Sequence, residues 1–177
     1  MKVRETSNRG SAALGFISAS ILLVLALGGW YATWHHYHYG GPTPVCATGN
    51  LHLSVGTTEG TAGTSYTHVV VVNQGNFACT ITGYPAVFLT DAGNNPIGSG
   101  AGLNTLSAVQ TVTLAPGKAA HVVVGFPDHN NFSTPNACGS ASANIELYPA
   151  GATSSLAAPL VQYNCPGFTT SAFAAGQ

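Results

Sequence analysis

The chain has 177 residues, of which 5% are charged and 45% are hydrophobic, and its formal net charge is −1. An average soluble protein has about 25% charged residues, so a soluble domain here must rely on Ser, Thr, Asn, Gln and Gly for its hydration. After Arg9 the only Lys or Arg is Lys118. Because a nucleic-acid surface needs clustered cations to displace counterions from phosphates, this composition excludes nucleic-acid binding.

An apolar segment spans residues 12–34. It is long enough for a membrane-crossing helix, since about 20 apolar residues cross the hydrocarbon layer. Lys2, Arg4 and Arg9 precede it, and positive charges favour retention of their side in the cytoplasm. The sequence therefore predicts a cytoplasmic arm over residues 1–11, one transmembrane signal-anchor helix over residues 12–34, and an extracytoplasmic remainder attached to the cell membrane.

A cleaved signal peptide is the alternative, because it also combines a basic start, an apolar run and small residues such as Ala26 and Gly28. The length of the run favours an uncleaved anchor, and so do Trp30 and Trp34, which occupy the position of an interfacial aromatic belt. Cleavage would make the protein a secreted one. No cysteine directly follows the apolar run, which argues against a lipid anchor.

Residues 35–45 have no apolar periodicity and contain the Gly and Pro typical of a linker. His35, His36 and His38 lie within this segment. Closely spaced imidazoles can bind a divalent metal ion, but a linker lacks the fixed geometry that makes a metal site selective. We therefore interpret the segment as a wettable stalk, with these three histidines as weak metal ligands at most, and expect no cofactor.

Residues 46–177 have the size of one domain and contain all four cysteines: Cys46, Cys79, Cys138 and Cys165. An even number of cysteines on the exported side predicts two disulfides. Three pairings are possible. Loop closure and chain order favour Cys46 with Cys79 and Cys138 with Cys165, and the sequence alone does not decide among the three.

This domain is a succession of short strand patterns separated by Gly, Pro and Asn turns, with no helical periodicity. Residues 66–73 and 77–82, joined by a Gly-containing turn, are expected to form a hairpin. The pattern as a whole predicts an all-β, immunoglobulin-like antiparallel β-sandwich. The strand patterns cover residues 51–55, 66–73, 77–82, 86–90, 109–114, 119–126 and 144–148, and more weakly 160–163 and 168–173.

Several motifs occur in a fixed order in this domain: Cys46, a Gly83-Tyr84-Pro85 run shortly after Cys79, the run Leu114-Ala115-Pro116-Gly117, and then Cys138 and Cys165. Together they resemble a family of domains of unknown function in actinobacterial envelope proteins and lipoproteins. The resemblance covers about residues 46–173. It implies a secreted or membrane-attached β-sandwich with two disulfides and no established activity. The chain departs from the lipoprotein members because it lacks a lipidation cysteine.

Catalytic constellations are not evident. Asp128 and His129 are adjacent in a polar loop, but neighbouring residues rarely orient each other as acid and base, and no Gly-x-Ser-x-Gly elbow supplies a nucleophile. Glu59, Asp91 and Glu146 fall in separate segments, and Glu146 lies within a strand pattern. We therefore expect that the protein is not an enzyme. A hydrolytic or metal-binding envelope protein is the alternative.

Two further groups of residues contain metal-ligand types. His68 and His121 each lie in a valine-rich strand and could form a small metal or proton site if they faced the same side, but exposed or core positions are the favoured interpretation. Residues 91–95 are rich in Asp and Asn yet lack the acidic ligands that calcium requires.

The favoured function is therefore a membrane-anchored extracytoplasmic module with a binding or structural role in the cell envelope. Residues 98–107 and 128–136 form long polar loops. Function often lies in loops carried by a rigid scaffold. We expect these two loops to contact an envelope protein or a glycan.

Overall fold

The computed structural model describes residues 41–61, 63–134 and 137–176. Residues Thr43–Gln177 form one compact unit. The predicted cytoplasmic arm, the predicted anchor helix and most of the predicted stalk, including its three histidines, lie outside the described residues. Within the described ranges, no helix has the length and apolarity needed to cross a membrane.

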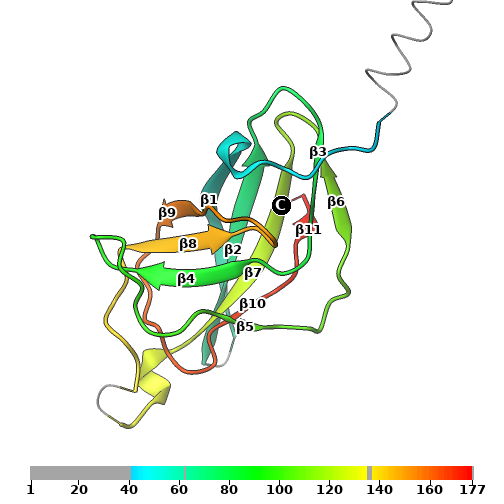
Figure 1. The fold of residues 1–177 in the computed structure, drawn as a ribbon. Coiled ribbons are helices and arrows are strands. Elements are labelled where there is room, and N and C mark those ends of the chain that lie inside the picture. Colours follow the sequence, from blue (N-terminus) through cyan, green and yellow to red (C-terminus); the bar gives the residue numbers. More distant parts are fainter. Residues whose placement is uncertain (1–40, 62, 135–136, 177) are drawn as a thin grey trace, which may run out of the picture. The chain divides into compact units, whose positions relative to one another are not determined.

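The domain is all-β, and its largest sheet has six strands (Figure 1). The long strands at its centre are antiparallel neighbours. Their valine-rich alternation lets each strand bury one face against the core. The last pairing, between β10 (Thr169–Thr170) and β5 (Gly102–Leu103), is parallel. The sheet has the order β1 (Leu51–Thr61), β2 (Thr64–Asn73), β7 (Ala119–Pro127), β10 (Thr169–Thr170) and β5 (Gly102–Leu103), with β11 (Ala174–Ala175) also paired to β7.

Two smaller sheets complete the fold. One joins β3 (Cys79–Thr82) to β6 (Thr111–Leu114), and the other has the order β4 (Ala86–Thr90), β8 (Asn144–Tyr148) and β9 (Leu156–Pro159). All their pairs are antiparallel. Among the described residues the only helices are two short 3-10 turns, η1 (Thr48–Asn50) and η2 (His129–Asn131).

Side chains from all three sheets meet in one core. In Figure 1, β4 and β8 cross in front of β2 and β7, and alternate residues of these strands are fully buried, among them Val71, Val122, Leu89 and Leu147. Burial of one such side chain is worth roughly 1.5–3 kcal/mol. This shared core fixes the strand ends, and therefore the loops that they carry.

Both disulfides are present, and they join Cys46 to Cys79 and Cys138 to Cys165, the pairing that chain order favours. A backbone hydrogen bond of 2.9 Å lies beside the first disulfide, where the amide of Cys46 donates to the carbonyl of Thr80. Pairing of Val45 with Thr80 shows that the chain already joins the domain just before the first cysteine.

The expected hairpin of residues 66–73 with residues 77–82 is wrong. β2 pairs with β1 and β7, whereas β3 pairs with β6 in a different sheet. The chain changes sheets at buried Asn73, whose Nδ2 donates to the carbonyls of Phe77 and Leu114 at 2.9 Å each. These bonds stabilise a crossing between sheets in place of a tight reversal.

The C-terminal part also differs from the expected strands. Pairing occurs at residues 156–159 and not over residues 160–163, where only Tyr163 forms an isolated bridge, to Ala141. The expected strand over residues 168–173 is reduced to the short β10, followed by the equally short β11. Hydrogen bonds to tertiary partners, and not local pattern, define these segments, as the bond from the Phe173 amide to the Gly83 carbonyl illustrates.

Candidate functional site

Two cavities open at one end of the domain, where the β1–β2 turn meets the segments that follow β7 and β9. The first has a volume of about 340 Å³ and the second about 450 Å³. His129 and Tyr163 line both cavities. Asp128 and Gln162 line the first. We call the set of Asp128, His129, Gln162 and Tyr163 the loop-end site.

An aromatic pair borders both cavities. The rings of His129 and Tyr163 have centroids 4.4 Å apart and planes tilted by 32°. Tyr163 is 40% exposed, and the side chain of His129 is 48% exposed. The pair therefore offers ring surface and polar atoms to solvent together, a combination common at binding surfaces.

Asp128 begins the short turn η2 and caps it. Its Oδ1 accepts hydrogen bonds of 2.9 Å from the backbone N and from the Nδ2 of Asn130. Its Oδ2 has no hydrogen-bond partner among the described residues and remains able to accept one from a ligand. The His129 Nδ1 lies 3.6 Å from Oδ1, which is too long for a hydrogen bond. The two side chains do not form an acid–base dyad in this geometry.

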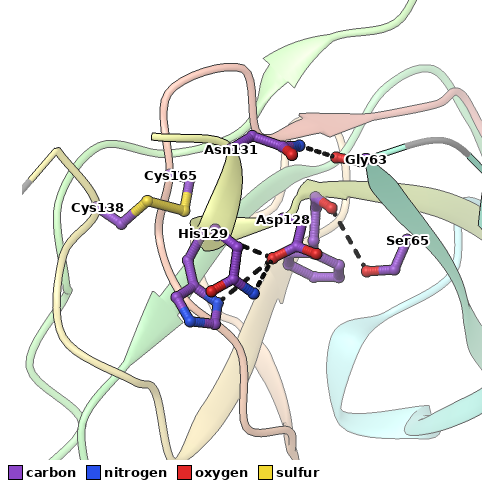
Figure 2. Close-up of a disulfide and its surroundings, with 9 residues drawn as sticks. Gly63, Ser65, Asp128, His129, Asn131, Cys138 and Cys165 are labelled. Atoms are coloured by element: carbon purple, nitrogen blue, oxygen red, sulfur yellow. Dashed lines mark hydrogen bonds and ion pairs between the residues drawn. A yellow bond between two sulfur atoms is a disulfide. The ribbon is translucent and has the colours of Figure 1, made fainter. Parts of the chain in front are cut away.

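The loop after β7 is fixed against the β1–β2 turn, as Figure 2 shows. The carbonyl of Gly63 accepts from the Asp128 amide at 2.9 Å and from the Asn131 Nδ2 at 2.8 Å. Gly63 has φ +84°, and a Cβ at this position would lie 2.6 Å from the Asn131 Nδ2. Only glycine fits this turn without strain or displacement of the loop.

The segment that carries Tyr163 is fixed on its other side. The next residues are Asn164, whose Nδ2 donates to the carbonyls of Ile97 and Ser99 at 2.6 and 2.8 Å, and Cys165, which is bonded to Cys138 (Figure 2). The disulfide joins the two segments that line the second cavity. The fold therefore holds the segments that carry Tyr163 and His129, so little conformational entropy would be lost when a ligand binds them.

The acidic residues named from the sequence lie apart. Glu59 is on β1, Asp91 follows β4, and Glu146 is on β8. Glu146 Oε1 accepts hydrogen bonds from the hydroxyls of Tyr148 at 3.2 Å and Ser155 at 2.5 Å. Over the described ranges, no three His, Cys, Asp or Glu side chains come together as metal ligands.

Asp91 organises a turn. Its carboxylate accepts from the amides of Gly93 and Asn95 and from the Asn95 side chain, over 2.8–3.1 Å. The hydrogen bonds from Asn95, more than that from Gly93, hold the pKa of Asp91 below its ordinary value of 3.8. The carboxylate is engaged by its own turn, which gives a structural role to the Asp- and Asn-rich residues 91–95.

The remaining residues named from the sequence fall in two places. His68 and His121 do face the same side, with ring centroids 5.0 Å apart. Of the two expected contact loops, the loop over residues 128–136 contributes Asp128, His129, Phe132 and Thr134 to the lining of the loop-end cavities, and its residues 135 and 136 lie outside the described ranges. Residues 98–107 do not line these two cavities. Tyr163 is not identifiable as a site residue from the sequence, because it lies inside a weak strand pattern and no local signal marks a residue positioned by a neighbouring disulfide.

A family model described as "Domain of unknown function (DUF4232)" matches residues 46–175. No curated protein and no solved structure matches the chain.

Proposed function

Because the chain belongs to the DUF4232 family, whose description carries no activity, we propose a function from its site: the protein is a membrane-anchored extracytoplasmic binding module that recognises an uncharged glycan of the cell envelope. The domain would be an immunoglobulin-like sandwich, anchored by the helix over residues 12–34 and raised on the stalk over residues 35–45. The loop-end site would take the ligand.

The aromatic pair of the loop-end site carries this proposal. An exposed ring can stack on the apolar C–H face of a sugar, while neighbouring polar groups bind its hydroxyls. Tyr163 and His129 supply the rings. The open Asp128 Oδ2 and the Gln162 side chain supply the polar groups beside them. The two cavities that this pair borders have volumes of about 340 and 450 Å³, within the range of small-ligand sites, roughly 300–1,000 Å³.

Charge composition supports a neutral ligand. Among the described residues, Asp128 is the only Asp, Glu, Lys or Arg that lines the first cavity. The whole chain has four Lys and Arg residues, of which three precede the apolar segment. No Lys or Arg of the described residues lines this cavity to pair with a phosphorylated or strongly acidic ligand. Neutral hydroxyl groups suit this surface because both donors and acceptors are available.

Binding without catalysis is supported by the lining of the loop-end cavities. Among the described residues, Asp128 is the only carboxylate that lines them, whereas glycoside hydrolysis generally uses a pair of carboxyl groups.

The test uses the full chain in mild detergent and a panel of neutral oligosaccharides built from glucose, mannose, arabinose or N-acetylglucosamine. Calorimetry should detect binding to at least one panel member. Tyr163→Ala should weaken that binding at least tenfold, and Tyr84→Ala, at a partly buried tyrosine outside both cavities, should not change it. Absence of binding across the panel, or equal affinities for both variants, would refute the proposal.

An envelope protein is the second candidate partner, supported by a separate surface. Within residues 98–107, Leu106 is 93% exposed, and Leu103, at the end of β5, is 59% exposed. Such apolar exposure suits a protein contact. A photoreactive amino acid at position 106 should then crosslink to one defined membrane protein in native membranes, and the same substitution at exposed Asn76 should not. If positions 106 and 76 gave the same crosslinked products, an envelope protein would be excluded as the partner of this surface.

A further inference from the structure

We propose that His68 and His121 form a two-histidine site for a divalent transition-metal ion on the outer face of the six-stranded sheet. The site is independent of the loop-end site. β2 and β7 are antiparallel neighbours, with His68 opposite Val123 and Val70 opposite His121. This register makes the two histidines diagonal neighbours on one face, within reach of each other. Their ring centroids are 5.0 Å apart.

The separation of the two rings fits a shared ion. A zinc-type ion binds an imidazole nitrogen at about 2.0–2.1 Å, which places the ring centroid roughly 3.2 Å from the ion. Two rings bound at angles between about 90° and 109° therefore have centroids roughly 4.5–5.3 Å apart. The observed 5.0 Å lies within that range.

His121 also has the outer contact that a ligating histidine needs. Its Nδ1 lies 2.7 Å from the carbonyl oxygen of Gly176. A carbonyl can only accept, so this nitrogen carries the proton and donates, and Nε2 keeps its lone pair free for a metal ion. Histidine ligands usually donate their second ring nitrogen to a carbonyl or carboxylate in this way. The contact both selects the tautomer and restricts the ring.

The backbone beneath the pair is rigid. β2 and β7 remain paired from Thr64 to Val72, and the inward-facing neighbours Val69 and Val122 are fully buried. Because the strands are fixed by the core, little order is lost when an ion bridges them. Two neutral imidazoles and open remaining positions suit Cu²⁺, Ni²⁺ or Zn²⁺, with Cu²⁺ bound most tightly. Water, or a donor from another molecule, would complete the coordination.

The experiment uses the full chain in detergent with His35, His36 and His38 changed to Asn, which removes the competing imidazoles of the predicted stalk. Zn²⁺ affinity is measured by calorimetry, and electron paramagnetic resonance of the Cu²⁺ complex counts the imidazole nitrogens. The parent should bind one ion through two imidazoles. His68→Ala and His121→Ala should each weaken Zn²⁺ binding at least tenfold and reduce the Cu²⁺ count to one.

The matched control is His52→Ala, at an exposed histidine of β1, which should retain the parent affinity and both nitrogens. Circular dichroism establishes that each variant folds. If His121→Ala unfolds because it loses the Gly176 contact, the Zn²⁺ affinity of His68→Ala alone decides whether the site exists. Parent-like Zn²⁺ affinity in His68→Ala, or an equal loss in His52→Ala, would overturn the site.

Discussion

Replacement of Asn73 by Ala should be among the most damaging polar substitutions in the domain. Asn73 is 1% exposed, at the end of β2. Its Nδ2 donates to the Phe77 and Leu114 carbonyls, and its Oδ1 accepts from the Gly75 amide, each at 2.9 Å. A hydrogen bond contributes about 1 kcal/mol net, and more where a buried partner loses its bond. The three contacts together predict a loss of about 3–4 kcal/mol of unfolding free energy.

Urea unfolding of the oxidised full chain in detergent, followed by circular dichroism, measures this loss. Asn76→Ala is the matched control, since Asn76 is exposed in the same turn and substitutions at such positions stay within about 0.5 kcal/mol. A loss below about 1 kcal/mol for Asn73→Ala, or equal losses for both variants, would refute the idea that this side chain stabilises the crossing between sheets.

Three further predictions concern the framework. Changing both cysteines of the Cys46–Cys79 disulfide to Ser opens a loop with a sequence separation of 33 and should cost about 3–4 kcal/mol by urea unfolding in the chain-entropy account; an unchanged unfolding midpoint would contradict it. Gly63→Ala should lower the free energy of unfolding more than Gly117→Ala. Both glycines have positive φ, but of the two only Gly63 has a side-chain atom within 3 Å of a new Cβ. Equal losses of unfolding free energy in the same assay would show that the contact with the facing loop is unimportant. The Asp91 carboxyl should titrate by NMR with a pKa below 3.8. Its contribution to stability is therefore complete above the unfolded pKa of about 3.9 and is lost as pH falls through the lower folded pKa. A measured pKa above 3.8 would contradict the role of the turn.

The sequence predicts the local structure of this domain well. Alternation and β-branched runs mark β1, β2, β4, β6, β7 and β8, because one buried face per strand leaves a period of two in the sequence. Chain order favours the observed disulfides, since both close short loops. The all-β class follows from these local signals alone.

Which strands pair with each other is less predictable from the sequence. The Gly-containing turn after β2 suggested a hairpin with β3, but the side-chain hydrogen bonds of Asn73 direct the chain into another sheet. The approach of His68 to His121 depends on the pairing of β2 with β7, which are far apart in the sequence. Tyr163 reaches the loop-end site because Asn164 and the Cys138–Cys165 disulfide hold its segment. Such contacts exist only after the fold has formed.

The most direct test of ligand binding at the loop-end site is an NMR titration of the isotope-labelled full chain in detergent with the oligosaccharide panel, with backbone amide shifts mapped onto the domain. We predict that the largest changes occur at residues 128–132 and 162–165, with no comparable change near Glu146, where a third cavity of about 440 Å³ lies. Changes centred on Glu146, or none at the loop-end site for any panel member, would contradict the account.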